Sequence, residues 1–503
     1  MKQFTVPFTG EYNSRIAQTN QASGESGVIG IGIVGDFIIG ASIQASDKDE
    51  RYINCFLTKM GSRQYIIKRP GMAALNTPQA GSVGSAILVW SGQGAGTKVM
   101  TAFGATNSSI YDGTTRLVTD AATTTAITGK ANGITETDVS GTATLVISSG
   151  DNTGWFYQDG GTVTKIVDAQ FPGASKTLAG TFAHIDGYAL IMTTDGYLSA
   201  SDLNSVSSWT AASTKATNAY PDKGVGCIRY KNLIMAFGTE SVEFYQNAGL
   251  SGFPFQRVGP MTQKVGAISA DAMGQIADNV FWVGATPQGG LSVFQYDGSI
   301  SRISTPEQDF QLVLAGPTNI SLTTLRFYGR SFVLIKANTT TYVYVVEDKH
   351  WHEWTSTTPL WYKAAGLSTG SQILTYSISN IATTGKVYVV NPASLVFTDD
   401  SAAYTALAQS MADDGGTPNV KIYHELNVVA DIEPSASTLT IAKSDDDFVT
   451  FDTLGTVDLS ASVRRLTRLG ASNKRAWRLS HSANTAFRIE RLQGRLTVGT
   501  HPR

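Results

Sequence analysis

A short β-hairpin unit recurs along most of this 503-residue chain and constrains its fold more than any other feature. Its clearest copy is Leu291–Ser304, where Asp297-Gly298 separates two runs of alternating apolar and polar residues. Asp-Gly between such runs predicts a tight turn, because glycine adopts a positive φ at no steric cost. Related units are centred on Asp112, Asp159, Asp202, Gln246, Asp297, Asp348 and Asn391. Neighbouring copies lie 43 to 51 residues apart, a period that indicates the blades of a β-propeller.

The repeat extends ahead of each turn. In Ile228–Tyr245, Leu325–Val346 and His184–Ser201 the order is strand, tight turn, apolar strand, polar turn and alternating strand. The residues after the outer turn supply a fourth strand. An apolar middle strand is typical of a strand packed on both faces, here between neighbouring blades. Seven turns predict about seven blades, and a β-sandwich with chance spacing is the alternative.

The start and end of the repeat divide the chain into three regions. We expect residues 1–80 to form an N-terminal arm and a small β element, residues 81–400 the β-propeller, and residues 401–503 a β-sandwich-like docking domain. From Lys421 the strands alternate without the blade period, over the roughly 80 to 90 residues of a small domain. The predicted fold class is therefore all-β: a propeller of about seven blades with an additional β-sandwich-like domain formed by the terminal segments.

Composition agrees with a turn-rich β protein: 50 residues are glycine and only 16% are charged. With 38 basic against 40 acidic residues, no basic face suited to static nucleic-acid binding is indicated. Cys55 and Cys227 lie in apolar strand contexts, which predicts buried free thiols and synthesis in a reducing cytoplasm. No signal peptide is expected at the N-terminus. The apolar run Val28–Gly40 is too short for a membrane helix and is expected to be a buried hairpin or an extended arm.

Ser401–Met411 fits a helix by spacing, but the alternation of Tyr404, Ala406 and Ala408 favours a strand. Thr119–Ser140 is a low-complexity stretch that is expected to form an outer loop or a weak strand pair.

The candidate chemical groups do not combine into a catalytic site, so we predict no catalytic, cofactor-binding or metal-ligating residues. His350 and His352 would share one face of a strand and could begin a zinc site, but no cysteine or third histidine is near them in sequence. The segment Ser444–Phe451 resembles the Asp-box of sialidases, a turn in which Asp446 caps backbone N–H groups without catalysing. Gly30–Gly35 contains G-x-G but lacks the context of a nucleotide-binding fingerprint.

A glycan-cleaving enzyme would need convergent groups that the sequence does not pair. A sialidase needs arginines to hold a carboxylate and a glycosidase needs two carboxylates. The blade arginines show no linking pattern, and the blade carboxylates sit at turns, where a structural role suffices. These residues are Arg229, Arg257, Arg302, Arg326 and Arg330, and Asp112, Asp159, Asp202 and Asp297.

Arginine and lysine are concentrated in the C-terminal region. A solvated strand face is the simpler interpretation and an acidic partner is the alternative. The residues are Arg464, Arg465, Arg468, Lys474, Arg475, Arg478, Arg488, Arg491 and Arg495.

Three segments resemble the packaged-DNA stabilisation, or tail-hub and tail-nozzle, proteins of short-tailed bacteriophages. Arg51–Leu75, with Asn54 ahead and Pro70-Gly71 behind, resembles the segment that leads into the propeller of that family. Gly224–Gly249, with Glu243-Phe244, is similar to a blade strand of the family, and Thr262–Gly298 resembles the segment that follows. The closing segment Phe487–Val498, FRIERLQGRLTV, also resembles the C-terminal strand of that family.

The resemblance implies a structural virion protein made in the host cytoplasm and located in the virion tail. It implies a homo-hexamer below the portal and the adaptor, or head-to-tail connector, ring. Such a ring retains packaged double-stranded DNA, conducts it during ejection without sequence-specific binding, and carries tail spikes, fibres or a needle. A carbohydrate-binding or glycan-cleaving propeller is the alternative, because fold does not fix function.

Overall fold

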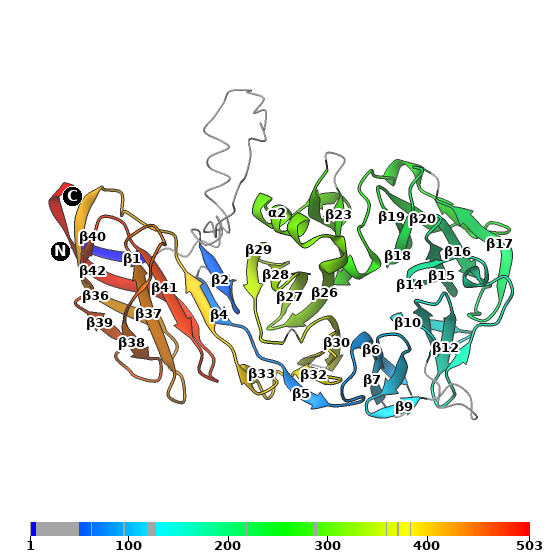
Figure 1. The fold of residues 1–503 in the computed structure, drawn as a ribbon, viewed down its shortest axis with the longest axis horizontal. Coiled ribbons are helices and arrows are strands. Elements are labelled where there is room, and N and C mark those ends of the chain that lie inside the picture. The colour runs from blue at the N-terminus through cyan, green and yellow to red at the C-terminus, as the bar shows by residue number, and fades with distance from the viewer. Residues whose placement is uncertain are drawn as a thin grey trace, which may run out of the picture.

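A computed structural model describes residues 2–6 and 50–502, apart from 62, 94–95, 118–126, 218, 277, 286–288, 359, 370–371 and 383. The described chain is built almost entirely of strands, in a propeller and a sandwich that lie side by side along the long axis of the molecule (Figure 1). The fold class is as predicted from the sequence. The Val28–Gly40 run, its Gly30–Gly35 motif and residues 119–126 lie outside the described residues. The rest of the 119–140 stretch contains β10 (Ala131–Val139), which pairs with the next strand and packs beside the innermost strands of the neighbouring blades, so the expected outer loop is wrong for residues 131–139.

Seven four-stranded blades make up the propeller. The first three are β6 (Gly84–Gln93), β7 (Gly96–Phe103), β8 (Ser109–Asp112) and β9 (Thr115–Leu117); β10 (Ala131–Val139), β11 (Thr142–Ser149), β12 (Gly154–Gln158) and β13 (Thr164–Lys165); and β14 (Leu178–Ile185), β15 (Tyr188–Thr193), β16 (Tyr197–Ser201) and β17 (Trp209–Ala216). The next two are β18 (Gly224–Tyr230), β19 (Leu233–Gly238), β20 (Val242–Asn247) and β21 (Phe255–Arg257); and β22 (Met273–Ile276), β23 (Asn279–Ala285), β24 (Leu291–Tyr296) and β25 (Ile300–Arg302). The last two are β26 (Ile320–Phe327), β27 (Arg330–Ala337), β28 (Thr340–Val345) and β29 (His350–Trp354); and β30 (Lys363–Thr369), β31 (Gln372–Ile378), β32 (Val387–Val390) and β5 (Ala73–Asn76).

The recurring turn lies between the third and fourth strands of a blade. Asp112-Gly113, Asp159-Gly160 and Asp297-Gly298 each form such a turn. Three copies differ: a seven-residue loop follows Ser201, Gln246 lies inside β20, with the loop after it, and Asn391 follows β32, whose partner strand β5 comes from the start of the chain. The apolar second strands are buried as expected, because each is covered by the blades on both sides.

The seventh blade closes the ring with a strand from the other end of the chain. β5 pairs antiparallel with β32, with Tyr388 opposite Ala74. The innermost strand β6 lies beside both β10 and β30, so the first and last blades are neighbours. A Cβ at Gly71 would lie 2.1 Å from the Thr398 carbonyl oxygen, which shows how closely the two crossing segments approach there.

One α-helix, α2 (Pro306–Ala315), stands among the described elements between the fifth and sixth blades. Thr305 and Gln308 form a capping box, in which each side chain bonds the backbone N–H of the other residue, and Pro306 occupies the first turn. We predicted no helix here. The Thr-Pro-x-Gln pattern is the signal that could have identified it.

The sandwich is built from both ends of the chain. One sheet has the order β3 (Cys55–Met60), β4 (Arg63–Lys68), β42 (Arg488–Pro502), β36 (Asn419–Ala430) and β39 (Arg465–Thr467), with β1 (Lys2–Val6) on β42 and β40 (Ala471–Ser472) on β36. The other has β2 (Arg51–Ile53), β35 (Ala406–Gln409), β41 (Ala476–His481), β37 (Thr438–Ser444) and β38 (Asp452–Asp458). Their facing sides share one core, which includes Leu57, Ile66, Leu426 and Trp477. Residues from 421 on therefore do not form this sandwich alone.

Strand assignments near the boundary also bear on the sequence predictions. Ser401–Met411 contains β34 (Ala402–Ala403), which pairs with β33 (Thr398–Asp399), and then β35, so the predicted strand is confirmed. The domain limits at residues 80 and 400 stay predictions. By sheet membership, residues 51–68 belong to the sandwich and residues 73–76 to the seventh blade.

A single sheet runs from the propeller into the sandwich. β29, the outer strand of the sixth blade, pairs parallel with β2, which pairs antiparallel with β35. The resulting nine-stranded sheet spans both parts of the molecule. Among the described residues, no helix is long and apolar enough to cross a bilayer.

Candidate functional site

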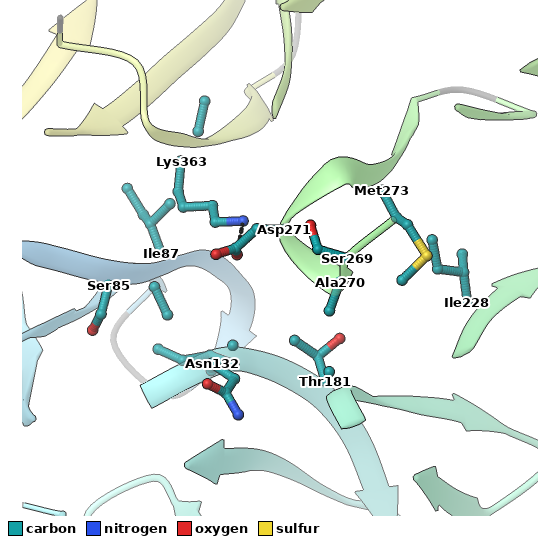
Figure 2. A pocket seen from close by; sticks show the side chains of 15 residues that line it. Ser85, Ile87, Asn132, Thr181, Ile228, Ser269, Ala270, Asp271, Met273 and Lys363 are labelled. Carbon is teal, nitrogen blue, oxygen red and sulfur yellow. Dashed lines mark ion pairs between the residues drawn. The ribbon is translucent and has the colours of Figure 1, made fainter. Parts of the chain in front are cut away.

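The propeller axis holds a pocket of about 330 Å³ with a mixed polar and apolar lining (Figure 2). It is lined from the innermost strands of six blades and by the 3₁₀ turn Ala270–Ala272. Small residues allow these strands to crowd around the axis: a Cβ at Gly133 would lie 2.2 Å from Thr181 Cγ2. The pocket is thus a narrow space inside one chain.

An ion pair crosses this pocket. Lys363 Nζ lies 2.7 Å from Asp271 Oδ1, and Tyr362 Oη donates to Asp271 Oδ2 at 3.1 Å. Lys130 Nζ in turn donates to Tyr362 Oη at 3.3 Å. Burial alone would raise the pKa of Asp271, but the nearby lysines and the tyrosine hydroxyl outweigh it and hold that pKa below its usual value. A carboxylate that is neutralised in this way links the fifth and seventh blades and is a poor general base.

A second cluster joins the propeller to the sandwich. Arg69 is fully buried and binds Asp399 through two parallel bonds, Nη1 to Oδ1 at 3.0 Å and Nη2 to Oδ2 at 2.6 Å. Arg69 Nε donates to Asn54 Oδ1 at 2.9 Å. The guanidinium also lies over the rings of Tyr404, at 3.9 Å, and Trp361, at 5.0 Å. A buried charge demands this degree of pairing.

Another bidentate pair reinforces the same junction. Arg51 Nε and Nη2 donate to Glu353 at 2.8 and 2.6 Å, next to the β2–β29 pairing. Neither pair was predicted, although Asn54 and the Arg69-Pro70-Gly71 run carried part of the family resemblance. The partners are some 300 residues apart in sequence. No local pattern could have matched them.

His350 and His352 are adjacent positions of one strand face in β29, as predicted. His352 is fully buried, both of its ring nitrogens lack a hydrogen-bond partner, and burial followed by His350 lowers its pKa to about 3. Within the described chain, no three His, Cys, Asp or Glu side chains group closely enough to hold a metal ion. The histidine packs against the rings of Tyr52 and Phe56.

The Asp-box-like turn has the structural role predicted for it. Asp446 Oδ1 accepts from the Thr450 N–H at 3.0 Å and from Ser444 Oγ at 2.8 Å. Phe448 is buried and adopts a φ of 70°, the left-handed conformation that glycine supplies in the usual motif. These contacts hold the pKa of Asp446 down, to about 2.

The blade arginines are not brought together. Each has a local partner: Arg257 pairs with Glu243, Arg302 with Asp309, and Arg330 with Asp348. Glu243 is itself buried and accepts from Tyr245 Oη at 2.8 Å, so it braces the fourth blade. Arg229 bonds the Lys231 carbonyl and Arg326 bonds the Ser331 hydroxyl.

The blade carboxylates also remain separate. Asp112 and Asp159 share Lys98 across neighbouring blades, whereas Asp202 accepts from Ser208 in its own loop and from Thr210 in β17. Asp297 accepts weakly from Ser299 in its turn.

Most of the C-terminal basic side chains are neutralised where they lie. Salt bridges join Arg465 and Arg495 to Glu425, Lys474 to Asp447, Arg475 to Asp445, Arg488 to Asp431, and Arg491 to Glu490. Arg478 donates to Gln409, and Arg464 to the backbone of Asp431. Most of these pairs favour the solvated-strand interpretation over an acidic partner, but Arg475 is fully buried and is a core residue of the sandwich instead.

All eight tryptophans are buried, at 7% exposure or less. Glycan sites usually present exposed aromatic rings beside convergent polar groups. The buried tryptophans therefore offer no exposed ring on which a sugar could stack, which disfavours the carbohydrate-binding alternative. Both cysteines are free and buried, as predicted.

The fold and the axial site define a class: a closed seven-bladed β-propeller joined through one continuous sheet to a β-sandwich. Residues 58–386 match the family model described as "Bacteriophage P22 Gp10, beta-propeller". The match covers more than half of the chain, so the chain belongs to this family of phage structural proteins. No curated protein matched the chain.

Proposed function

We propose that this phage structural protein forms the tail nozzle, or hub, ring of a short-tailed phage, below the portal and its adaptor. There six copies retain the packaged double-stranded DNA and conduct it during ejection. Family membership supplies the phage structural class. The observation that carries the more specific role is the junction between propeller and sandwich, where a strand bridge and two buried or half-buried ion pairs join the two parts.

A wall that holds DNA under pressure must not hinge between its parts. Contacts between domains of one chain are usually modest, so relative motion is the default. Here one parallel bridge, with Ile53 opposite Glu353, joins β2 to β29 across the boundary, and the Arg51–Glu353 and Arg69–Asp399 pairs lie on either side of it. Bending the molecule at this point would break a continuous sheet and expose a buried charge.

The DNA path follows from the size of the axial pocket. A pocket of about 330 Å³, crossed by the Asp271–Lys363 pair, does not admit a duplex whose major groove alone is about 12 Å wide. DNA therefore passes between copies, which requires a ring around a shared channel.

We further propose that the sandwich and the N-terminal region dock onto the adaptor ring and the tail spikes, fibres or needle. The protein would be made in the host cytoplasm, in keeping with its free thiols, and then join the virion tail. The position of the sandwich supports this role, because it forms one end of the molecule, beyond the sixth and seventh blades (Figure 1).

Electron microscopy of particles that contain this chain tests the proposal. We expect density for six copies in a ring below the adaptor, with DNA or its exit path on the ring axis. Particles in which the chain lies elsewhere, or surrounds no axial channel, would refute the nozzle role. They would leave the family assignment untouched.

A further inference from the structure

Lys421, the third residue of β36, is a buried cation without a carboxylate partner. It is 2% exposed, and none of the ion pairs among the described residues involves it. A buried charge requires a counter-charge or hydrogen bonds, because its removal from water is costly. The ammonium group of lysine has three donors and no acceptor. Each of these donors must therefore find an oxygen.

Three backbone carbonyl oxygens surround this ammonium group. Lys421 Nζ donates to the carbonyl oxygens of Thr417 at 2.7 Å, Asn419 at 3.0 Å and Asn473 at 2.7 Å. The first two oxygens come from the start of β36 and the loop before it, and the third from the turn after β40. All three donors are used, on two separate segments of the sandwich. Oxygen atoms arranged in this way around one positive charge are also what proteins offer to hard metal cations.

The loop ahead of Lys421 folds around this charge. Asp413 Oδ1 accepts from the N–H of Gly415 at 2.8 Å, and Asp414 Oδ1 accepts from the N–H of Gly416 at 2.9 Å. Both glycines have a positive φ, and a Cβ at Gly415 would lie 3.2 Å from Lys421 Cε. Burial lowers the pKa of Lys421, and the charges of Asp414 and Asp413 oppose that effect. The loop therefore adds two carboxylates to the three carbonyl oxygens.

This loop lies at the end of the sandwich. Asn419 pairs with Pro502 beside the C-terminus, which Figure 1 shows at the end of the molecule away from the propeller. A glycine-containing loop in such a place is ordinarily among the first segments to open. Here the backbones of Asp413 and Arg475 exchange two hydrogen bonds of 3.0 Å, and the ammonium group ties the rest of the loop to Asn473. The loop is held at both of its ends.

We propose that residues 413–419 form a cation-binding loop in which the ammonium group of Lys421 takes the place of a metal ion. Because this cation is covalently attached, the loop keeps its shape at any metal concentration. A variant that lacks the ammonium group and leaves room for an ion should bind Ca²⁺, which accepts carbonyl and carboxylate oxygens in flexible geometries. This inference concerns the sandwich alone and does not depend on the nozzle proposal.

Hydrogen–deuterium exchange of the full chain, followed by mass spectrometry of peptides that cover residues 410–423, tests the inference. Lys421→Ala should speed exchange in these peptides by about tenfold or more, because three hydrogen bonds from a charged group are lost. Ca²⁺ at about 5 mM should restore slow exchange, since weak natural calcium loops have dissociation constants of about 0.1–1 mM. Mg²⁺ should not, because it demands a near-octahedral set of ligands at shorter distances.

Two control variants separate the charge from the side chain. Lys421→Met keeps most of the stem, lacks the charge and fills the space that an ion needs, so its fast exchange should not respond to Ca²⁺. Lys474→Ala removes a neighbouring lysine that is 39% exposed and paired with Asp447, and it should leave these peptides unchanged. The wild type should exchange at the same rate in Ca²⁺ and in a chelator.

Slow exchange restored by Ca²⁺ in Lys421→Ala, and in no other variant, supports the inference. Exchange as slow in Lys421→Ala or Lys421→Met as in the wild type overturns it, because the ammonium group would then not hold the loop. Fast exchange in Lys421→Ala that Ca²⁺ does not slow overturns it as well. If Lys421→Ala does not fold in metal-free buffer, refolding with Ca²⁺ decides the question: recovery supports the inference, and no recovery overturns it.

Discussion

At the residue scale, the immediate surroundings determine what the candidate groups do. Asp271 would be a plausible acid or base if it were free, but Lys363 and Tyr362 occupy both of its oxygens. His352 would be a plausible metal ligand if other metal-binding side chains lay beside it, but it packs against the rings of Tyr52 and Phe56. In both cases the surroundings turn a reactive side chain into a structural one.

His352 should make the protein sensitive to acid. Its pKa is lowered to about 3 in the fold against the ordinary 6.5, so the unfolded chain binds the extra proton between these values. Stability from this residue is complete above pH 6.5 and falls as the pH drops toward 3, by about 2 kcal/mol at pH 5. His352→Leu should lose this part of the dependence, measured by denaturant unfolding at pH 7 and pH 5. The exposed His424→Gln should behave as the wild type, and an unchanged pH dependence in His352→Leu would contradict the assignment.

At the element scale, the important connections are made between strands that are distant in sequence. β5 completes the seventh blade from the start of the chain, and β2 carries the sixth blade into the sandwich. Between these two strands lies the Arg69 cluster, which holds the linking segment against Asp399. Together these three features close the ring of blades within the chain and attach the sandwich to it.

Arg69→Ala should destabilise the fold strongly, because Asp399 would remain buried without a partner. Breaking such a pair costs about 3–5 kcal/mol. The matched control is Arg63→Ala, whose pair with Glu490 is exposed and contributes less than about 1 kcal/mol. Replacing both buried partners, as in Arg69→Met with Asp399→Leu, should cost less than Arg69→Ala alone. Denaturant unfolding of the three variants and the wild type measures these differences, and equal losses for Arg69→Ala and Arg63→Ala would argue against the junction.

At the scale of the whole molecule, near-neutral charge suits the channel of the proposed ring, through which DNA would slide. Each phosphate neutralised by lysine or arginine adds salt-dependent affinity, and a six-fold ring multiplies every such contact. The chain has 38 basic and 40 acidic residues, and much of its C-terminal basic charge is paired internally. A channel lined by small polar and acidic side chains is the expected result.

The purified protein should therefore bind double-stranded DNA weakly. We expect no saturable binding to a short duplex at protein concentrations of about 10 μM and salt near 50 mM, since strong non-specific binders reach dissociation constants of about 1 μM even at physiological salt. Fluorescence anisotropy across a salt series measures this, with a basic DNA-binding domain as the positive control. Tight binding that weakens steeply with salt, or a ring whose narrowest layer is dominated by lysine and arginine, would be inconsistent with this expectation.

The sequence by itself determined the blades. Turn residues and the alternation of apolar and polar residues act over a few positions. Asp297-Gly298 and the related turns therefore predict the strands, their order along the chain and the spacing of the blades from local sequence alone. The capping box at Thr305 was equally local and equally readable. Tertiary structure alone decided which distant segments meet: β5 on β32, β2 between β29 and β35, Arg69 with Asp399. A strand edge can pair with many other strands, and a buried arginine can pair with any carboxylate. The sequence therefore does not specify these partners, and only the folded positions of the two ends of the chain do.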